Sequence, residues 1–518
     1  ELEAITPSTS FDGGMGTYDS PYQISSAEQL AGIGSSATFL SKSYILNNDI
    51  DLTCKDFSPI GSISGPFKGN LFGNNKVIRG MINSDVGGDY RGLFAYIYPS
   101  SGGYSGFIQN LGLIGSMVEG NTYVGALAGK IYGGVSLEGV YATGKVTGFG
   151  GSGHSKIGGL IGHCYSSSTF NRLISYVDVE GYQTVGGLVG HLQSSTMRFS
   201  YSLGNVTSSY LYTGGFAGYT SSATLQHIYS SSPVISDGRH IGGLIGIMAY
   251  GKIKNSISTG NVISNNLSSS TQGGGLVGRL YGASAVIQNS YSSGTVKGYK
   301  YLGGLVGYVR HSNTVIDSSS SSDVQGTQYV GGLFGGFYSD ASEATVERLS
   351  FLGMASGDRD THAIVGYNKS TPSIEDTFYL DDACDTDDNC TAVYGTSKSE
   401  AQLKLQETYT GWNFNGGGSW KFYDDGEFPH MSRLKCLFGS ETVVPDTDYS
   451  GSGTSESPYL IDSVEKLAGI SLNLTAHYKL LPTLITLTDV YVGADLEVNL
   501  HLFQAHLMVE TLRYLHYC

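Results

Sequence analysis

Charged residues are scarce in this chain, and most of them are acidic. Of 518 residues 14% are charged, with 29 Lys and Arg against 44 Asp and Glu, for a formal net charge of −15. No basic stripe occurs, so we expect no binding to nucleic acid or to an anionic membrane surface. No run of about 18 apolar residues occurs either, so we expect no membrane-spanning helix. The chain starts at Glu1 without a signal-like segment, and we expect any signal peptide to have been removed and any anchor to lie in a missing part.

Cysteine is also sparse, with six residues and no C-x-x-C pair, so the cysteines form no metal-ligand set. Cys384 and Cys390 lie six residues apart in an acidic segment, where a small disulfide and two free thiols both remain open. Five N-x-S/T sequons would be glycosylation sites in a secreted eukaryotic protein. The candidate asparagines are Asn205, Asn266, Asn368, Asn389 and Asn473.

Glycine, in contrast, is abundant, with 75 residues, about double the usual share of ~7%. Ten glycine-rich clusters such as V-G-G-L-V-G (Val185–Gly190) return along the chain at gaps of 28 to 34 residues. A period near 28 residues predicts a stack of similar coils, in which the central apolar residue of each cluster lies above the previous one. These residues are Leu93, Leu127, Leu160, Leu188, Phe216, Leu244, Leu276, Leu305, Leu333 and Ile364.

The sequence divides into four parts. We assign residues 1–44 to an N-terminal leader and cap, and 45–366 to a solenoid of ten or more coils with two or three short strands each. Residues 367–440 form a C-terminal cap region, and 441–518 form the truncated start of a second module with an unassigned tail. A solenoid core grows in one dimension, so the length of 518 residues does not require several globular domains.

The N-terminal cap is repeated near the end of the chain. Residues 14–33 and 451–470 are identical at thirteen of twenty positions. In both copies Ser-Pro-Tyr leads into a short amphipathic helix, predicted over Ala27–Ile33 and Val464–Ile470, which would cover the open strand edge of a first coil. Beyond the second copy the pattern is lost, and residues 482–518 are either foreign sequence or an error in the gene prediction.

The region after the last glycine cluster has a different composition. A helix is predicted over Lys398–Gln406, with a capping box formed by Ser397 and Glu400. Both tryptophans of the chain, Trp412 and Trp420, follow it. We expect this region to close the C-terminal end of the solenoid.

Several of these segments resemble the GLUG-motif family, whose glycine-rich repeats occur in large secreted and surface-attached proteins. Members include adhesins and the non-catalytic stalk of IgA-cleaving metallopeptidases. The resemblance covers about residues 14–436 and implies an all-β fold, a parallel β-helix. It is carried by S-P-Y-Q-I (Ser20–Ile24), P-F-K-G-N-L-F-G-N-N-K-V-I (Pro66–Ile78), the glycine ladder, N-S-Y-S-S-G-T-V (Asn289–Val296) and G-T-S-K-S-E-A-Q-L (Gly395–Leu403). Metallopeptidase chemistry is not carried over, because the twelve histidines include no H-E-x-x-H.

Two groups of ionisable residues are candidates for catalysis. Glycoside hydrolysis needs two facing carboxylates, and a lyase needs a base, commonly with Arg or Lys nearby. We interpret both groups as charged turns outside the rod, because the regular coils carry few charges and no coil-to-coil run of Asp, Arg or Lys marks a cleft. The candidates are Asp358, Arg359, Asp360 and His362, and then Asp424, Asp425 and Glu427.

Two further groups have weaker patterns. The acidic segment around Cys384 could hold Ca²⁺ through carboxylate and backbone oxygens, but it lacks the D-x-D-x-D-G spacing, and no cofactor is predicted. Its candidate ligands are Asp381, Asp385, Asp387 and Asp388. Clusters of Tyr and Ser could form a face for carbohydrate or a partner, or be ordinary outward decoration of strands. They are Tyr210 and Tyr212, Tyr299 and Tyr301, and Ser318–Ser322.

From these observations we expect a non-catalytic β-solenoid that is secreted or attached to the cell surface. It would serve as an adhesion rod, a structural rod or a filament subunit, with surface glycans, proteins or further copies of itself as partners. A stiff stack holds outward side chains in register, so that weak contacts multiply. The alternative is a carbohydrate-active β-helix enzyme, either a polysaccharide lyase or a glycoside hydrolase.

Overall fold

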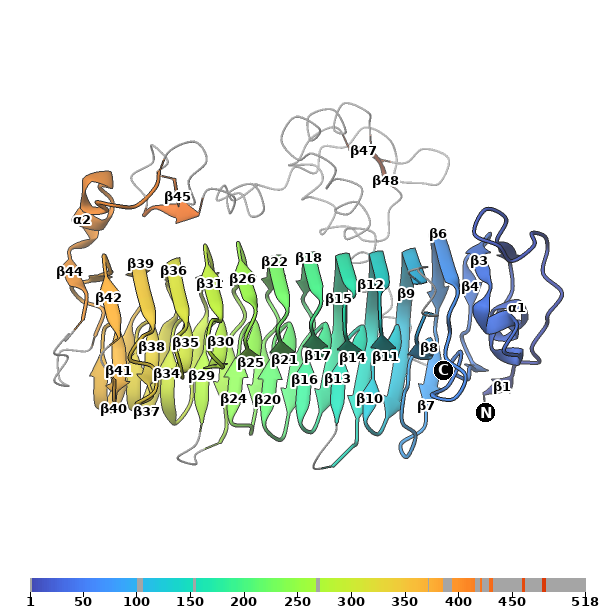
Figure 1. Cartoon of the computed structure of the whole chain (residues 1–518), viewed down its shortest axis with the longest axis horizontal. Coiled ribbons are helices and arrows are strands. Elements are labelled where there is room, and N and C mark those ends of the chain that lie inside the picture. The colour runs from blue at the N-terminus through green and yellow to red at the C-terminus, as the bar shows by residue number, and fades with distance from the viewer. Residues whose placement is uncertain are drawn as a thin grey trace. The chain divides into compact units, whose positions relative to one another are not determined.

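The computed structural model of the chain is an all-β structure built on a parallel solenoid (Figure 1), which confirms the expected fold class. It divides into two units, one formed by residues 1–413 with 424–429 and the other by 414–423 with 430–518. The structure describes residues 2–99, 106–151, 155–266, 271–370, 372–384, 394–414, 420–421, 428–431, 459–461 and 478–480.

A typical coil contains four short strands rather than the two or three that we expected. They are β16 (Thr184–Gly186), β17 (Val189–Gln193), β18 (Thr196–Ser202) and β19 (Val206–Ser208). The Gly-Leu corner inside the glycine cluster separates β16 from β17 and so adds a strand. Each strand pairs in parallel with its counterpart in the next coil. These counterparts are β20 (Tyr212–Gly214), β21 (Ala217–Ser221), β22 (Thr224–Ser230) and β23 (Val234–Ser236).

The strands that follow the glycine corner form one ten-stranded parallel sheet, which runs from the first regular coil to the last (Figure 1). Besides β17 and β21 it contains β8 (Phe94–Ile97), β11 (Ala128–Tyr132), β14 (Ile161–Tyr165), β25 (Ile245–Ala249), β30 (Val277–Tyr281), β35 (Val306–Val309), β38 (Phe334–Phe337) and β41 (Val365–Asn368). The strands that precede the corner stack beside this sheet. Besides β16 and β20 they are β10 (Tyr123–Val124), β13 (Lys156–Gly158), β24 (His240–Gly242), β29 (Gln272–Gly274), β34 (Lys300–Gly303), β37 (Asp323–Gly331) and β40 (Ala355–His362).

The remaining walls are formed by longer or interrupted strands. In the first regular coils a single strand covers two walls, and in later coils it is split at a turn. These strands are β9 (Gly106–Gly120), β12 (Val135–Gly148), β15 (Thr169–Gly181), β26 (Lys252–Lys254), β27 (Ile257–Ser258), β28 (Val262–Ser264), β31 (Val286–Gln288), β32 (Tyr291–Ser292), β33 (Thr295–Lys297), β36 (Thr314–Ser320), β39 (Thr345–Phe351), β42 (Ser373–Glu375) and β43 (Phe378–Leu380).

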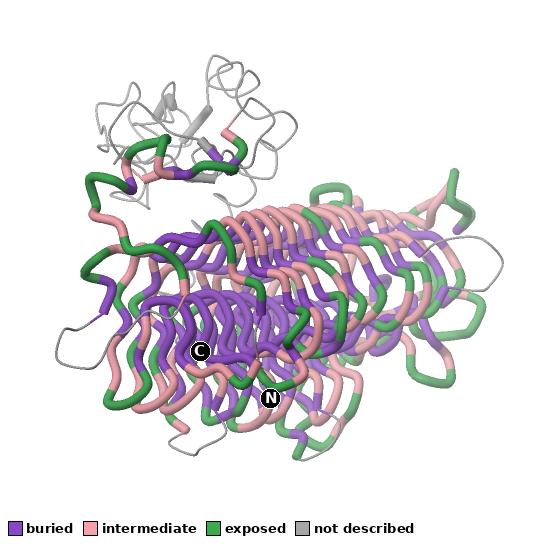
Figure 2. The backbone as a smooth tube through the Cα atoms, turned by 60° about the vertical axis from the view of Figure 1, so that its left-hand side comes forward, coloured by how far each residue is buried: buried purple, intermediate pink, exposed green. Residues whose placement is uncertain are grey.

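The central residues of the glycine clusters lie inside this stack. Leu127, Leu160, Leu188, Phe216, Leu244, Leu276, Leu305 and Leu333 are all fully buried. The backbone N–H of each donates to the carbonyl of the corresponding residue in the next coil, as from Leu160 to Leu188 at 2.9 Å. In Figure 2 the buried residues line the inner side of the coils. Each such leucine contributes on the order of 1.5–3 kcal/mol by burial, so stability comes from stacking and not from a single coil.

A second corner of each coil is made by one residue in the left-handed backbone conformation. Asn255, Asn289 and Asp317 occupy it in successive coils, with φ of 51°, 50° and 51°. The serine that follows joins the coils together. The Ser256 hydroxyl donates to Lys254 O at 2.8 Å and accepts from the backbone N–H of Ile228 in the preceding coil at 3.2 Å.

A short helix covers the N-terminal end of the stack. The helix α1 (Ala27–Gly32) has Ser26 as its N-cap and continues into a 3₁₀ turn. Leu30 and Ile33 are fully buried. The helix lies in the connection between two parallel strands, β2 (Tyr22–Ile24) and β3 (Ser43–Leu46).

The C-terminal end is closed by aromatic side chains. The helix α2 spans Glu400–Leu403 and is shorter than predicted, and its capping box is formed by Ser399 and Gln402 rather than by Ser397 and Glu400. The ring centroids of Tyr409 and Trp412 lie 4.9 Å apart, and the Tyr409 ring lies 5.4 Å from that of Phe378 in the last coil.

The second unit is described only at four short strands. β45 (Trp420–Lys421) and β46 (His430–Met431) pair antiparallel. β47 (Tyr459–Ile461) and β48 (Tyr478–Leu480) pair in parallel, with Tyr459 opposite Tyr478 as Tyr22 is opposite Tyr44 in the N-terminal cap. The backbone pairing of the cap is thus repeated. The predicted helix Val464–Ile470 and residues 482–518 lie outside the described residues.

Candidate functional site

The residues that flank each glycine cluster meet on the outside of the solenoid. In Tyr301-L-G-G-L-V-G-Tyr308, for example, the two flanking tyrosines are seven positions apart in sequence, and their ring centroids are 4.7 Å apart. The corner of the glycine cluster turns the chain back on itself between them. Every regular coil repeats this arrangement, so two columns of side chains face one another along the solenoid axis. We call these two columns the seam.

The strand register defines the members of the seam. The column before the corner contains Tyr90, Tyr123, Lys156, Thr184, Tyr212, His240, Gln272, Tyr301, Tyr329 and Asp360. The column after it contains Tyr96, Lys130, His163, His191, Tyr219, Ile247, Arg279, Tyr308, Gly336 and Tyr367. Tyrosine, histidine and cationic residues dominate both columns, and their one acidic member, Asp360, is at the C-terminal end.

Glycine is required at the base of the seam because backbone meets backbone there. A Cβ at Gly190 would lie 2.5 Å from the carbonyl oxygen of Gly162 and 2.6 Å from the backbone nitrogen of Ile157. A Cβ at Gly218 in the next coil would lie 2.6 Å from the nitrogen of Val185. This close approach of the two strand columns brings their flanking side chains together.

Aromatic and imidazole rings stack from coil to coil within the seam. The centroids of His163 and His191 lie 4.8 Å apart with an interplanar angle of 14°, and those of His191 and Tyr219 lie 4.5 Å apart at 16°. The rings of Tyr123 and His163 stack at 5.8 Å. The spacing follows the distance between neighbouring parallel strands, about 4.8 Å. One continuous ring stack therefore spans at least four coils.

The seam histidines are held in the neutral form. Burial lowers the pKa of His163 to about 2, with smaller contributions from His191, Lys156 and Lys130. Burial likewise lowers the pKa of His191 and of His240 to about 3. The ring nitrogens of His163 and His191 are buried and make no hydrogen bond to the described protein atoms. A neutral imidazole offers one donor and one acceptor, so this stretch holds unused polar groups.

Cations of the seam lie over tyrosine rings in or beside it. The ammonium of Lys130 is 5.4 Å from the ring centroid of Tyr96 and 5.7 Å from that of Tyr123. The guanidinium of Arg279 lies 5.0 Å from the ring of Tyr281. Burial lowers the pKa of both cationic groups. Within the described chain no ion pair joins Lys130 or Arg279 to a carboxylate.

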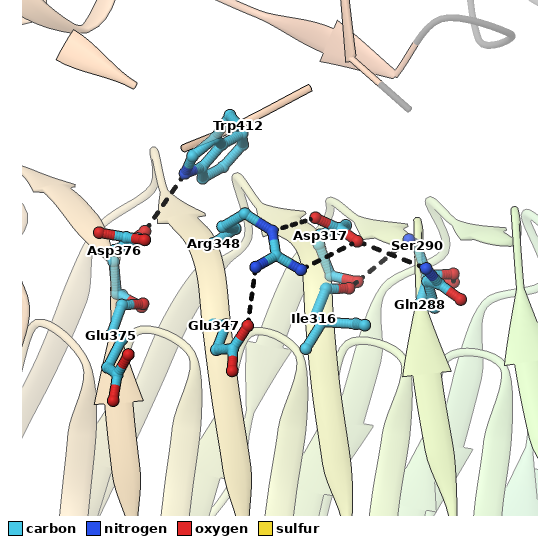
Figure 3. A network of polar contacts seen from close by, with 11 residues as sticks. Gln288, Ser290, Ile316, Asp317, Glu347, Arg348, Glu375, Asp376 and Trp412 are labelled. Carbon is cyan, nitrogen blue, oxygen red and sulfur yellow. Dashed lines mark hydrogen bonds and ion pairs between the residues drawn. The ribbon is translucent and has the colours of Figure 1, made fainter. Parts of the chain in front are cut away.

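Carboxylates bind an arginine elsewhere, at the left-handed corner of the last coils (Figure 3). Arg348 Nε donates to Asp317 Oδ1 at 2.6 Å, and its Nη1 donates to Glu347 at 2.7 Å. These bonds raise the pKa of the guanidinium. One coil further, Trp412 Nε1 donates to the carbonyl oxygen of Asp376 at 3.3 Å. The Arg348 contacts join two successive coils, and a separate bond joins the closing tryptophan to the last coil.

The predicted catalytic candidates do not all fall within the described residues. Asp358, Arg359 and Asp360 are exposed on β40. Asp360 accepts a long hydrogen bond of 3.4 Å from Gln328 Nε2. The described structure brings neither aspartate to a pocket. The other candidate group, Asp424, Asp425 and Glu427, lies outside the described residues, and so catalysis stays untested.

The predicted calcium loop is described only in part. Asp381 is exposed, and Asp385, Asp387 and Asp388 lie outside the described residues. Cys384 is disulfide-bonded, while Cys390 also lies outside them. In the described part of the chain no cluster of three or more His, Cys, Asp or Glu side chains is placed to hold a metal ion.

Three of the five sequon asparagines are described, and each donates a hydrogen bond from its side chain. Asn205 bonds to Asp178 at 2.9 Å, Asn266 bonds to the carbonyl of Asp237 at 2.8 Å, and Asn368 bonds to the Tyr394 hydroxyl. Asn389 and Asn473 lie outside the described residues. Glycosylation stays a prediction at all five.

The predicted Tyr clusters and the predicted Ser cluster lie in different environments. Tyr212 and Tyr301 are members of the seam, and Tyr210 stacks on Tyr182 at 5.1 Å. The suggestion that Ser318–Ser322 forms part of an outer face is wrong, because Ser318, Ser319, Ser320 and Ser322 are buried. The Ser318 hydroxyl donates to Ile316 O at 2.8 Å, and the Ser320 hydroxyl accepts from the backbone N–H of Ser322 at 3.1 Å.

Sequence reasoning missed the seam as a site. The signal was the pair of residues on either side of each V-G-G-L-V-G cluster, seven positions apart. Read down the ten copies, these flanks are rich in Tyr, His and cations although the chain as a whole is acidic. Recognising them as one surface requires the geometry of the corner, which brings the flanks together.

Comparison with known proteins confirms the resemblance on which the fold expectation rested. The family model "The GLUG motif" matches residues 269–297, which run from before β29 to the end of β33. This stretch contains the cluster G-G-G-L-V-G (Gly273–Gly278) and the Asn289-Ser290 corner. The chain thus carries the GLUG motif in a solenoid coil.

Two curated proteins are similar to part of the chain. Halomucin of Haloquadratum walsbyi is 33% identical over 161 residues, which are 29% of this chain and 2% of Halomucin. A protein named as a proposed Gly-rich membrane protein of Evansella cellulosilytica is 36% identical over 137 residues, which are 24% of this chain and 15% of that protein. The matched segment is therefore a small part of each relative.

Among solved structures, the chain is similar to a proposed immunoglobulin A1 protease from Bacteroides ovatus. The TM-score is 0.34 with 17% identity, and the alignment covers 82% of this chain and 95% of the other.

Proposed function

We propose that this chain is a non-catalytic β-solenoid rod that acts outside the cell or on its surface in adhesion or structural support. The observation that carries the proposal is the seam, because it repeats aromatic and polar side chains in register over ten coils, and most of them are at least partly exposed. Repetition of weak contacts along a stiff frame gives avidity that no single coil has.

The comparisons with known proteins also support this function. The chain carries the GLUG motif, and part of it is similar to two curated proteins, one of which is named as a Gly-rich membrane protein. None of the helices in the described part of the chain is long and apolar enough to cross a membrane. Self-association through the repeated cap segment 451–480 would extend the rod into a filament.

The test is a binding experiment run beside a degradation experiment. The purified full chain should attach to surfaces coated with glycans or with extracellular proteins, and it should leave a panel of polysaccharides at full length. Chain shortening that is abolished by Asp360→Asn or Asp425→Asn would overturn the proposal in favour of a carbohydrate-active enzyme. Absence of attachment to every surface would also overturn it.

A further inference from the structure

The distribution of charge over the seam is opposite to that of the whole chain. The chain carries a net charge of −15. The seam columns nevertheless hold Lys130, Lys156 and Arg279, and Lys300 lies 4.7 Å from the seam ring of Tyr329. Among the seam members and the residues directly before them in sequence, carboxylates occur only at the two ends of the seam. Asp89, which acts on Tyr90 and Tyr123, is at the N-terminal end, and Asp360 is at the C-terminal end. The middle of the seam is thus a cationic strip on an acidic protein.

Two of these cations, Lys130 and Arg279, are partly withdrawn from water. Lys130 and Arg279 are half-buried, and the described chain offers neither an ion pair with a carboxylate. Burying a charge without a partner is unfavourable. An anion that docks on the seam would supply the missing partner through charge-assisted hydrogen bonds. The described structure therefore favours a negatively charged ligand at this place.

The groups between the cations suit a ligand rich in hydroxyl groups. His163 and His191 are neutral and more than nine-tenths buried, and their ring nitrogens are buried with them, so they place no charge at this surface. Tyr212 and Tyr219 follow, with ring centroids 5.7 Å apart. Both tyrosines are partly exposed, and a tyrosine combines an apolar ring with a hydroxyl that both donates and accepts hydrogen bonds, as sugar hydroxyl groups do. Phosphate groups alone would call for donors only.

We propose that the middle of the seam, from Lys130 to Arg279, binds an extended acidic polysaccharide that runs along the solenoid axis. This inference rests on the proposed adhesion function and gives it a ligand class. Five strand spacings separate Lys130 from Arg279, which is about 24 Å. A ligand that contacts both cations must be a polymer of several sugar units. A nucleic acid fits less well, because its phosphates need a dense row of cations and the net charge of the chain repels them.

The test measures binding of the full chain to four immobilised polymers. They are polygalacturonate and heparin as acidic polysaccharides, dextran as a neutral one, and single-stranded DNA. We expect an acidic polysaccharide to bind, with weaker binding at high salt and weaker binding of fragments shorter than the distance between the two cations. Tighter binding of DNA, or equal binding of dextran, would overturn the inference.

Matched variants locate the binding surface. The double variant Lys130→Gln with Arg279→Gln removes two seam cations, and Lys252→Gln with Lys297→Gln removes two exposed lysines outside the seam. Both pairs change the net charge equally. We expect the seam variant to weaken binding of the acidic polymer by about tenfold or more and the control to bind like the parent chain. An equal loss in both variants would show that the seam is not the site.

The same experiment separates this inference from the proposed function. Attachment to protein-coated or neutral glycan surfaces without binding to either acidic polymer would overturn the ligand class and leave the adhesion rod standing. Shortening of the acidic polymers during incubation, measured as new chain ends, would overturn the non-catalytic function. Unchanged far-ultraviolet circular dichroism of both double variants is the check that the solenoid is intact.

Discussion

Replacement of Gly190 by alanine should destabilise the solenoid at the base of the seam. The added Cβ would lie 2.5 Å from Gly162 O and 2.6 Å from Ile157 N, both backbone atoms of the preceding coil. Ordinary contacts are about 3.5 Å or longer, so the two strands must separate by about 1 Å. Backbone held in a parallel ladder cannot move aside as a side chain does, so the cost should fall near the upper end of the usual overpacking range of about 1–3 kcal/mol.

A glycine in the bend between β11 and β12 is the control. Gly134 is exposed, and a Cβ there would meet only Ser167 O, at 3.9 Å. Alanine at this position loses no contact and lowers the entropy of the unfolded chain, which is worth about 0.4–1 kcal/mol in favour of folding. The two variants should therefore differ by roughly 2–4 kcal/mol in the free energy of unfolding.

Urea unfolding followed by tyrosine fluorescence and by circular dichroism measures this difference. Hydrogen exchange adds a local reading, because the amides of Leu188 and Phe216, which bond to neighbouring coils, should lose protection in Gly190→Ala but not in Gly134→Ala. Equal stability of the two variants would refute the reasoning. The glycines of the cluster would then not be required by backbone contact, and the account of how the seam forms would fail with it.

Three other predictions follow from the same structure. Leu188→Ala should lower the free energy of unfolding by about 2–5 kcal/mol, since the leucine is fully buried, and a loss below that of a surface change would contradict the stacked core. Ser256→Ala should cost about 1–3 kcal/mol in the same assay, because it leaves the Ile228 N–H without its acceptor; an unchanged urea midpoint would argue against the serine link. The depressed pKa values of His163 and His191, about 2 and 3, make stability full above the unfolded value near 6.5 and make it fall as the pH drops from there toward 3. His191→Gln should reduce this slope by about 1.4 kcal/mol per pH unit, and a slope unchanged across pH 4–6 in urea titrations would count against neutral, buried imidazoles.

The fold could be predicted from the sequence because every glycine cluster repeats the same structural requirement. The Leu of each cluster must lie in the core, and the neighbouring Gly must lie against backbone. The repeat period is therefore visible directly in the amino-acid sequence. The left-handed corner was harder to see. Asn255 and Asn289 suggest it, but Phe199 and Arg348 occupy the same corner with φ of 48° and 52°. Coil stacking overrides the local preference of these residues, which a single sequence does not reveal.

The seam was harder still, because its members share no residue type and no regular strand pattern. Tyr, Lys, His, Gln and Arg alternate at the two flanks, so the positions look like ordinary outward decoration. The flanks come together only through the turn of the glycine corner. The capping box was misassigned for a similar reason, because Ser397 and Ser399 both precede the helix and the sequence does not distinguish them. In the structure Ser397 belongs to the strand β44 (Thr396–Lys398), which leaves Ser399 as the N-cap.

The seam also explains how one frame can present varied chemistry. Within the cluster, glycine at positions such as Gly190 is fixed by contact with the backbone of the preceding coil, and the central leucine is fixed by burial. The flanks carry neither constraint, and in this chain they range from Lys130 and His191 to Ile247 and Gly336 without interrupting the ladder. A change at a flank alters the surface while the coil that holds it stays the same. The ligand preference of the surface can therefore change along the rod one coil at a time. The part of the seam between Lys130 and Arg279 is one stretch with its own set of side chains.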